Sequence, residues 1–252
     1  MKLKKLFNVV RMLAQTPVFW LILLMVLAGP LGYSADFKEG GYVGTAGQGH
    51  DTVVYNFLKH FSYEQYYWAI PSQFTTNNNN RVDAMTIAFF AGHGSPWSIL
   101  CQSTSVDLKT AGTSSHKGWG NVASKFVAFE SCKVVPSPIE TSDWAYPWTK
   151  PGGVFDGVHQ VIGFRTNSWQ SSDQDISDYF GCRMRNGCRV WQSWFDAIIA
   201  KGRREWSWGC WCMKLKEYGS AVMWPPAEND TYGSWCANPP QNHTWLKVWY
   251  QH

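Results

Sequence analysis

Charged side chains are scarce in this sequence. Asp, Glu, Lys and Arg make up 16% of its 252 residues, whereas soluble domains average about 25%. Hydrophobic residues reach 45%, so the chain can bury a core and is too apolar for a disordered protein. The length fits one sizeable domain or two small ones, and the sequence contains no internal repeat.

A basic patch is also missing from most of the chain. The formal net charge is +4, but Lys2, Lys4, Lys5 and Arg11 all lie in the first 34 residues, where no acid occurs. Subtracting these four charges from +4 leaves zero for the remainder. Because a nucleic-acid-binding protein is expected to carry a basic patch, the charge distribution argues against a nucleic-acid partner.

No apolar run is long enough to span a membrane comfortably, which takes roughly 20 residues. The basic start is followed by the short run "VFWLILLMVLAG" and by small residues at Gly32 and Ser34. This pattern predicts a secretory signal peptide over residues 1–34 and a secreted, periplasmic or extracellular protein without further membrane contact. An uncleaved anchor is the alternative. No cysteine lies near the cleavage point, which argues against a lipid anchor.

Apolar runs and helical patterns alternate along the chain, and this order predicts an α/β sandwich with a mainly parallel central sheet. The tail from 203 onward is rich in Trp and Cys, and we expect it to form a loop-like extension of the 35–202 domain with two late strands. The asparagine run at 75–80 is expected to be a solvated loop. Strands are expected at 40–46, 83–90, 125–131, 158–164, 220–224 and 244–250, and helices at 51–61, 173–184 and 189–201.

Two polar residues directly follow two of the predicted buried strands. His93 lies in "AGHG", and Cys132 lies in "ESC", 39 residues later. In a parallel sheet the active site lies beyond the carboxyl ends of the strands, so adjacent strands would bring both residues to one edge. Taken alone, a histidine between glycines is more often a turn residue, and a cysteine after an apolar strand is usually buried or disulfide-bonded.

The two residues together have the groups that acyl transfer requires. A thiol becomes a nucleophile when a nearby imidazole accepts its proton. The tetrahedral intermediate needs donors aimed at its oxygen, and the backbone N–H groups of Gly94 and Cys132 are suitably placed in the sequence. The pair therefore predicts a His–Cys dyad.

The segment "DAMTIAFFAGHG", followed by "KFVAFESC", resembles the caspase-like (clan CD) superfamily of cysteine peptidases. This superfamily includes caspases, gingipains, legumains, separase and the CHAT domains. Its members share a hydrophobic strand ending in His-Gly and a later strand ending in a small residue plus Cys. The following region, up to residue 202, is similar to the strand, loop and two helices of CHAT-like domains. "GWGNVASKFVAFESC" further resembles an exported, uncharacterised branch of the superfamily.

The resemblance implies a caspase-like three-layer α/β/α sandwich and a cysteine endopeptidase or related acyl-transfer enzyme. It also implies a protein or peptide substrate and no cofactor. His93 matches the general base, Cys132 the nucleophile and Gly94 the first oxyanion donor. Five further residues are candidates for substrate binding, namely Trp97, Glu130, Trp169, Asp173 and Asp175.

Two of these candidates have plainer interpretations. An acid at Asp173 or Asp175 would favour a basic P1 side chain, but Asp173 is more readily explained as a cap of the helix that follows. Glu130 shares a strand face with Cys132 by the two-residue period and would orient the site, or else pair with a surface lysine.

The seven cysteines bear on the dyad because an exported chain meets an oxidising compartment, where pairing is the default. With Cys132 free, the other six would form three disulfides, and Cys182 and Cys188 are close enough in sequence to close a small loop. Zinc binding at Cys210-x-Cys212 matches no common ligand spacing, so no metal is expected.

A second hypothesis is a binding module with a silent dyad. The chain has 16 tryptophans, and Trp206, Trp208, Trp211 and Trp235 lie near cysteines in the tail. Such an aromatic patch would grip peptide or glycan, although a small satellite core is the simpler explanation for these tryptophans.

Overall fold

The structure is a computed structural model that describes residues 37–252 except 63, 103, 110–117, 150–152 and 240–244. The expected signal peptide lies outside the described residues. Lys38–His252 form one compact unit. No helix in the described part of the chain combines the length and hydropathy needed to cross a bilayer.

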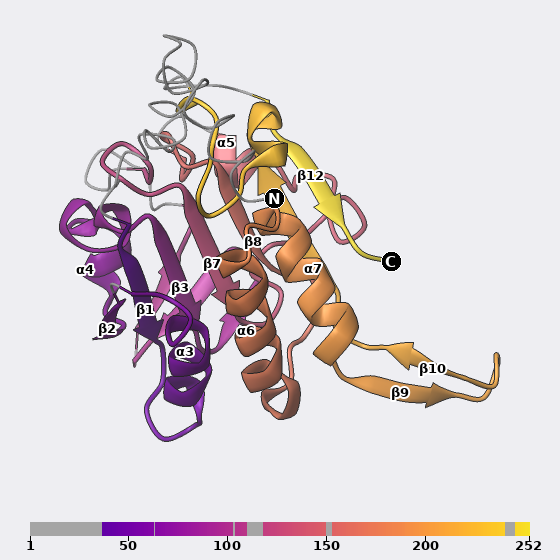
Figure 1. Cartoon of the computed structure of the whole chain (residues 1–252). Coiled ribbons are helices and arrows are strands. Elements are labelled where there is room, and N and C mark those ends of the chain that lie inside the picture. Colours follow the sequence, from indigo (N-terminus) through magenta and orange to yellow (C-terminus); the bar gives the residue numbers. More distant parts are fainter. Residues whose placement is uncertain (1–36, 63, 103, 110–117, 150–152, 240–244) are drawn as a thin grey trace, which may run out of the picture. The chain divides into compact units, whose positions relative to one another are not determined.

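A seven-stranded sheet forms the centre of this unit, in the order β12-β11-β8-β7-β3-β1-β2 (Figure 1). All neighbouring pairs are parallel except those made by β11, which runs antiparallel to β8 and to β12. The predicted mainly parallel α/β fold is therefore confirmed. The strands are β1 (Glu39–Val43), β2 (Glu64–Trp68), β3 (Ile87–Ala91), β7 (Phe126–Glu130), β8 (Gln160–Phe164), β11 (Gly219–Met223) and β12 (Lys247–Tyr250).

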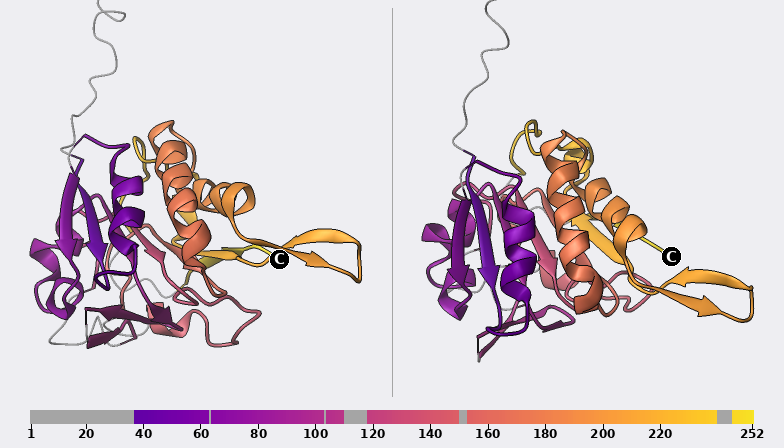
Figure 2. Two further views of the ribbon diagram at one scale, coloured as in Figure 1. Left: turned by 90° about the horizontal axis from the view of Figure 1, so that it is seen from below. Right: turned by 60° about the horizontal axis from the view of Figure 1, so that its bottom comes forward.

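Three helices cover one face of the sheet, as both views of Figure 2 show. They are α3 (His50–Leu58), α6 (Gln170–Arg185) and α7 (Val190–Lys201). All three were expected from their apolar spacing, but α6 begins three residues earlier than predicted, after Trp169. The other face is covered by loops and short helices, namely α4 (Pro71–Phe74), α5 (Tyr146–Thr149) and the 3-10 helices η1 (Asn78–Asn80) and η2 (Val82–Ala84).

The adjacent phenylalanines of β3 show how the sheet builds a core on each face. Successive side chains of a strand point to opposite faces. Phe89 lies against the helices, with its ring 4.3 Å from Phe57 of α3 and 6.4 Å from Phe180 of α6. Phe90 points the other way and meets Phe74 of α4 at 5.7 Å between ring centroids. The continuous apolar run is therefore what a strand buried on both faces requires.

Two polar or loop-like predictions were wrong. The asparagine run at 75–80 is not a solvated linker, because Asn78 is 1% exposed and donates a 2.9 Å hydrogen bond to the carbonyl oxygen of Gly118. The first part of the Trp/Cys-rich tail is a two-stranded hairpin of β9 (Arg204–Ser207) and β10 (Cys212–Leu215). Figure 1 shows this hairpin extending away from the sheet beyond α7.

A second, smaller sheet lies just after β3 in the sequence. It contains β4 (Gly94–Ser95), β5 (Ser98–Cys101) and β6 (Thr104–Asp107), in that order. The remaining short element is the 3-10 helix η3 (Pro225–Asn229), which lies between β11 and β12 in the sequence.

The expectation of three disulfides was wrong. Cys210 and Cys212, the two cysteines at the end of the β9–β10 hairpin, are bonded to each other. All seven cysteines lie in the described part of the chain, and the other five, Cys132 among them, are free thiols. Cys182 and Cys188 flank the end of α6 without a bond.

Phe89→Ala tests the helix-side core. Removing a ring that packs between two helices leaves a cavity, which we expect to lower the free energy of unfolding by about 3–5 kcal/mol. Urea denaturation followed by circular dichroism measures the change. Tyr55→Ala is the matched control, because Tyr55 lies on the outer face of α3 and is 60% exposed; a similar loss in both variants would contradict this account of the core.

Candidate active site at the carboxyl edge of the sheet

The pairing of β3 with β7 places His93 and Cys132 at the same level. In this parallel pair Ala91 lies opposite Glu130, a separation of 39 residues, and the same separation relates His93 to Cys132. The N–H of Gly92 continues the pairing beyond the strand by donating a 3.2 Å hydrogen bond to the carbonyl oxygen of Glu130. Because neighbouring strands lie about 4.8 Å apart, the two residues emerge side by side from the carboxyl edge.

His93 is exposed at this edge and is held by two neighbours from the loop before α3 and its first turn. Its Nε2 lies 2.5 Å from Oε1 of Gln48. Its ring also meets the ring of His50 edge-on, at 5.4 Å between centroids. Burial lowers the pKa of His50, so this second imidazole stays neutral at neutral pH. His93 is therefore oriented by a neutral amide and a neutral ring.

Gly94 allows the two strand ends to approach each other. A Cβ at this position would lie 2.3 Å from Oγ of Ser131 and 2.5 Å from Cγ2 of Val134, which is far inside van der Waals contact. Both contacts come from the segment around Cys132. A side chain at position 94 would consequently push His93 away from the cysteine.

Cys132 is a half-buried free thiol. The backbone N–H of Ser168 points at its sulfur at 3.4 Å, and the Ser168 hydroxyl lies 3.6 Å away. Ser168 follows β8, so the ends of three neighbouring parallel strands converge on this site. In the described residues no hydrogen bond joins the sulfur to the His93 ring, which is bonded to Gln48 instead.

A shallow cavity of about 200 Å³ adjoins His93 on the side of the small sheet. Hydroxyl groups line much of it, so it can accept an extended polar chain. Its lining residues are His93, Gly94, Ser95, Ser98, Ile99, Leu100 and Ser105.

Three buried carboxyl groups lie beneath the cysteine, on the helix side of the sheet. Glu130 is 1% exposed, and burial, followed by the charge of Asp173, raises its pKa well above the usual range. Burial also raises the pKa of Asp173 to about 7. The carboxyl of Glu217 has a pKa raised by burial and accepts hydrogen bonds from the N–H of Trp169 at 2.7 Å and of Arg203 at 2.5 Å. This group of carboxyls is a structural support of the site's floor.

The position of these carboxyls bears on the candidate substrate contacts. Glu130 does not pair with a surface lysine, because it is buried and its electrostatic neighbours are acidic. Asp173 lies in the first turn of α6, accepts a hydrogen bond from the N–H of Trp169 and is 4% exposed. This placement agrees with the helix-start interpretation of Asp173.

The other candidates are distributed around the site. Trp97 is half-buried on the small sheet, near the ammonium group of Lys109. Trp169 is half-buried at the start of α6, with the guanidinium of Arg203 5.3 Å from its ring centroid. Asp175 is exposed and lines a different cavity, of about 260 Å³, with His60, Asp178, Tyr179, Cys182 and Lys201.

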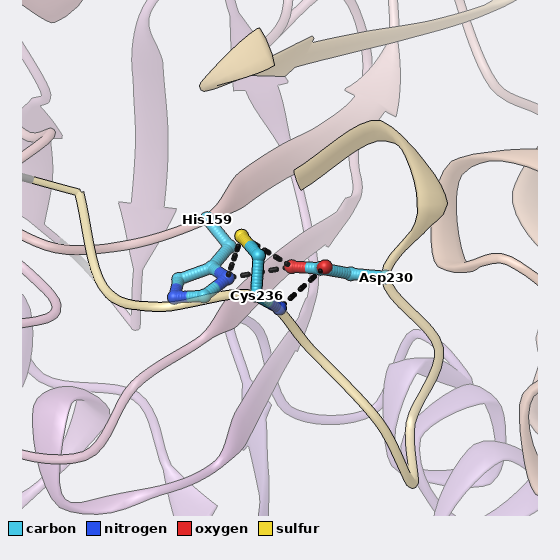
Figure 3. Close-up of side chains that lie close together, drawn as sticks. All are labelled: His159, Asp230 and Cys236. Carbon is cyan, nitrogen blue, oxygen red and sulfur yellow. Dashed lines mark hydrogen bonds and ion pairs between the residues drawn. The ribbon is translucent and has the colours of Figure 1, made fainter. Parts of the chain in front are cut away.

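A second cluster, at the opposite edge of the sheet, was not anticipated from the sequence. His159 directly precedes β8, and its Nδ1 lies 2.6 Å from Oδ2 of Asp230 and 3.7 Å from Sγ of Cys236 (Figure 3). These residues are 71 and 77 positions apart from His159, and no sequence motif links them. Burial raises the pKa of Cys236 to about 11, so this thiol lacks the activation of a nucleophile.

Comparison with known families supports the sequence resemblance only at a coarse level. The family model described as "Domain of unknown function (DUF6345)" matches residues 25–250. The chain therefore belongs to this family. No curated protein has a significantly similar sequence.

Among solved structures, the chain is similar to the Arg specific cysteine proteinase gingipain R (RGPB). The TM-score is 0.42 and the sequence identity 11%, over 65% of this chain and 41% of that one. This chain thus spans less than half the length of the proteinase that it matches.

Asp173→Asn tests the buried carboxyls. The folded-state pKa of about 7 exceeds the ordinary value of 3.8, so the folded protein binds more protons than the unfolded chain between these values. Stability contributed by the protonated group is present below pH 4 and is lost as the pH rises through 7. We expect the variant to be more stable than the wild type at pH 8, by up to about 4 kcal/mol, and little changed at pH 4.

Thermal unfolding at the two pH values measures this difference. Asp175→Asn is the control, because Asp175 lies on the same helix but is exposed and should show no such pH-dependent gain. Equal stability of Asp173→Asn and the wild type at pH 8 would show that the ionised carboxylate is not penalised.

Proposed function

We propose that this DUF6345 protein is a cysteine peptidase, or a related acyl-transfer hydrolase, with Cys132 as nucleophile and His93 as general base. The observation that carries the proposal is the level placement of these residues at the ends of two paired parallel strands. The free state of Cys132 is a second support, because a disulfide at this position would remove the nucleophile. Ligands of α/β sheets bind at this edge.

The proposed reaction begins when His93 accepts the thiol proton. Gln48 occupies Nε2 of His93, which leaves Nδ1 for this proton. The thiolate then attacks the peptide carbonyl carbon, and the C=O bond becomes an oxyanion bound by the N–H groups of Gly94 and Cys132. The C–N bond breaks as His93 returns the proton to the leaving amine. Water hydrolyses the resulting thioester, with His93 again acting as the base.

The surroundings of the dyad fit an extended peptide better than a small polar ligand. The cavity beside His93 lies along the small sheet β4–β5–β6 and is shallow. Backbone groups at the edge of such a sheet can pair with an extended chain. Since Asp173 and Glu130 are buried beneath the floor, they orient the site and leave P1 recognition to surface residues such as Trp97 and Trp169.

The place of action is also part of the proposal. We place the activity outside the cytoplasm, because residues 1–34 have the basic start and apolar run of a secretory signal.

Cys132→Ala and His93→Ala test the dyad. With a fluorogenic peptide library as substrate, we expect Cys132→Ala to abolish turnover. His93→Ala should lower kcat about 100-fold or more, since general-base catalysis contributes factors of this size. Labelling with iodoacetamide should modify Cys132 preferentially in the wild type and more slowly in His93→Ala.

Cys182→Ala is the matched control, since Cys182 is an exposed free thiol on α6. It should keep full activity. Undiminished turnover in Cys132→Ala, or a Cys132 no more reactive than a denatured thiol and indifferent to His93, would refute the peptidase proposal.

A binding function is the second candidate, and the exposed hairpin β9–β10 favours it. Trp208 and Trp211 are 72% and 73% exposed and meet edge-on at 5.7 Å, with Trp206 beyond Trp208 at 6.2 Å. The satellite-core explanation was wrong for these three rings. Trp235 does not join them, because it lies against Phe126 at the sheet. Such a row of rings can stack on sugars or on the side chains of a peptide.

A glycan array and a peptide library, both probed with Cys132→Ala, test the hairpin. For any ligand retained, we expect the double variant Trp208→Ala/Trp211→Ala to weaken binding roughly 10-fold or more. Trp245→Ala is the control, because Trp245 is 62% exposed but lies outside the hairpin. The absence of a ligand in both screens would count against a binding role.

A further inference from the structure

The cluster of His159, Asp230 and Cys236 joins three separate segments of the chain. His159 directly precedes β8, Asp230 ends η3, and Cys236 lies in the loop that leads towards β12. His159 and Asp230 are buried, at 0% and 3% exposure, and Cys236 is half-buried. His159 is one level beyond the Phe126–Gln160 pair, opposite Lys125. The cluster therefore lies about 20 Å from Cys132, at 3.3 Å per residue along the strand.

The three ligand atoms have nearly the spacing of a tetrahedral zinc site. Nδ1 of His159, Oδ2 of Asp230 and Sγ of Cys236 all lie within 4.8 Å of one another. The sulfur is 3.7 Å from Nδ1 and 3.7 Å from Oδ2. With Zn–S near 2.3 Å and Zn–N or Zn–O near 2.1 Å, tetrahedral geometry puts these edges at about 3.6 Å. The third edge, Nδ1 to Oδ2, is a 2.6 Å hydrogen bond and must open to about 3.4 Å.

The surrounding contacts orient these ligands towards one point. Nε2 of His159 lies 3.3 Å from Oδ1 of Asn238, the arrangement by which a metal-bound histidine is usually held through its other nitrogen. Oδ1 of Asn238 is itself fixed by the Lys125 ammonium at 2.5 Å. The second oxygen of Asp230 accepts a 2.9 Å hydrogen bond from the N–H of Cys236. Each ligand therefore has a partner that keeps its free atom facing the other two.

An alternative explanation, a second Cys–His nucleophile, does not fit this geometry. A catalytic imidazole contacts the thiol with one nitrogen and an orienting group with the other. Here the carboxylate and the thiol both approach Nδ1 of His159. Convergence of three different donors on one point is the arrangement of a cation site.

We propose that His159, Asp230 and Cys236 bind a Zn²⁺ ion, with water as the fourth ligand. The mixed N, O and S donor set is characteristic of zinc. Binding breaks the S–H bond of Cys236, forms the Zn–S bond and releases the thiol proton to solvent; the zinc also displaces the proton shared by His159 and Asp230. One thiolate and one carboxylate then balance the two positive charges of the ion, which suits a buried site.

The site would tie the C-terminal loop to the start of a central strand. Asp230 and Cys236 belong to the segment between β11 and β12, whereas His159 belongs to the parallel core. Because a metal bound only by the folded chain stabilises it, zinc fastens this segment to the sheet. The sequence expectation of no metal site is revised by this proposal.

The test uses the full chain, stripped of metal with a chelator and titrated with Zn²⁺ alone. We expect one equivalent of bound zinc by elemental analysis and a melting temperature that rises with zinc concentration. Cys236→Ser should weaken zinc binding about 100-fold or more, because it removes the thiolate. Asn238→Ala should weaken it about 10–100-fold, as loss of an outer-shell partner does. Cys188→Ser, which removes another half-buried free thiol, should bind as the wild type does.

Cobalt substitution separates a lost ligand from a lost fold. Co²⁺ bound at this site should give a sulfur-to-metal charge-transfer band in the wild type and in Cys188→Ser but not in Cys236→Ser, with far-ultraviolet circular dichroism unchanged. Absence of a bound equivalent in the wild type would overturn the proposal. So would unchanged zinc affinity in Cys236→Ser, which would place the metal elsewhere, for example at the dyad.

Discussion

The pairing of β3 with β7 is the constraint on which the candidate active site depends. A parallel ladder carries its register along its whole length, so the 39-residue offset in the strands also applies to the residues that follow them. His93 and Cys132 meet because five residue pairs earlier in the strands are already aligned. Phe89 and Phe90 hold β3 in place by packing against opposite layers. The side chains of the core thus set the geometry of residues that lie at the surface.

Electrostatics divides the two edges of the sheet. At the carboxyl edge the dyad sits above carboxyl groups whose raised pKa values keep them largely protonated, so the floor beneath the cysteine carries little negative charge. A protonated floor suits a site in which a thiolate must form, since fixed negative charge nearby would oppose it. At the amino edge a histidine, a carboxylate and a thiol are drawn together around one nitrogen. The same sheet therefore supports two chemically different clusters at opposite ends of its strands.

The tail, from residue 203 onward, contributes more than an appendage. β11 and β12 complete the central sheet, and Glu217 binds backbone N–H groups of the loop that precedes α6. The segment between these strands supplies two of the three proposed zinc ligands. Only the hairpin β9–β10 stands apart, and its disulfide and exposed tryptophans make it the part of the chain best suited to contact another molecule.

Local patterns in the sequence were sufficient for the main elements. The strands around 87–91, 126–130 and 160–164 and the helices α3, α6 and α7 follow from apolar runs and helical spacing, because burial on one or both faces imposes those periods. Patterns failed where long-range partners decide the outcome. Asn78 is buried because the carbonyl oxygen of Gly118 receives its amide, and neither residue signals the other in the sequence.

By itself, the sequence determined the α/β fold class and the candidate dyad, because strand ends and glycine-flanked polar residues are local features. The tertiary structure alone decided which cysteines are free, which carboxyl groups are buried beneath the site and which distant residues surround His159. These properties depend on distances between segments that are up to 79 residues apart in the chain. Composition and spacing do not encode such distances; the packing of helices and loops against the sheet does.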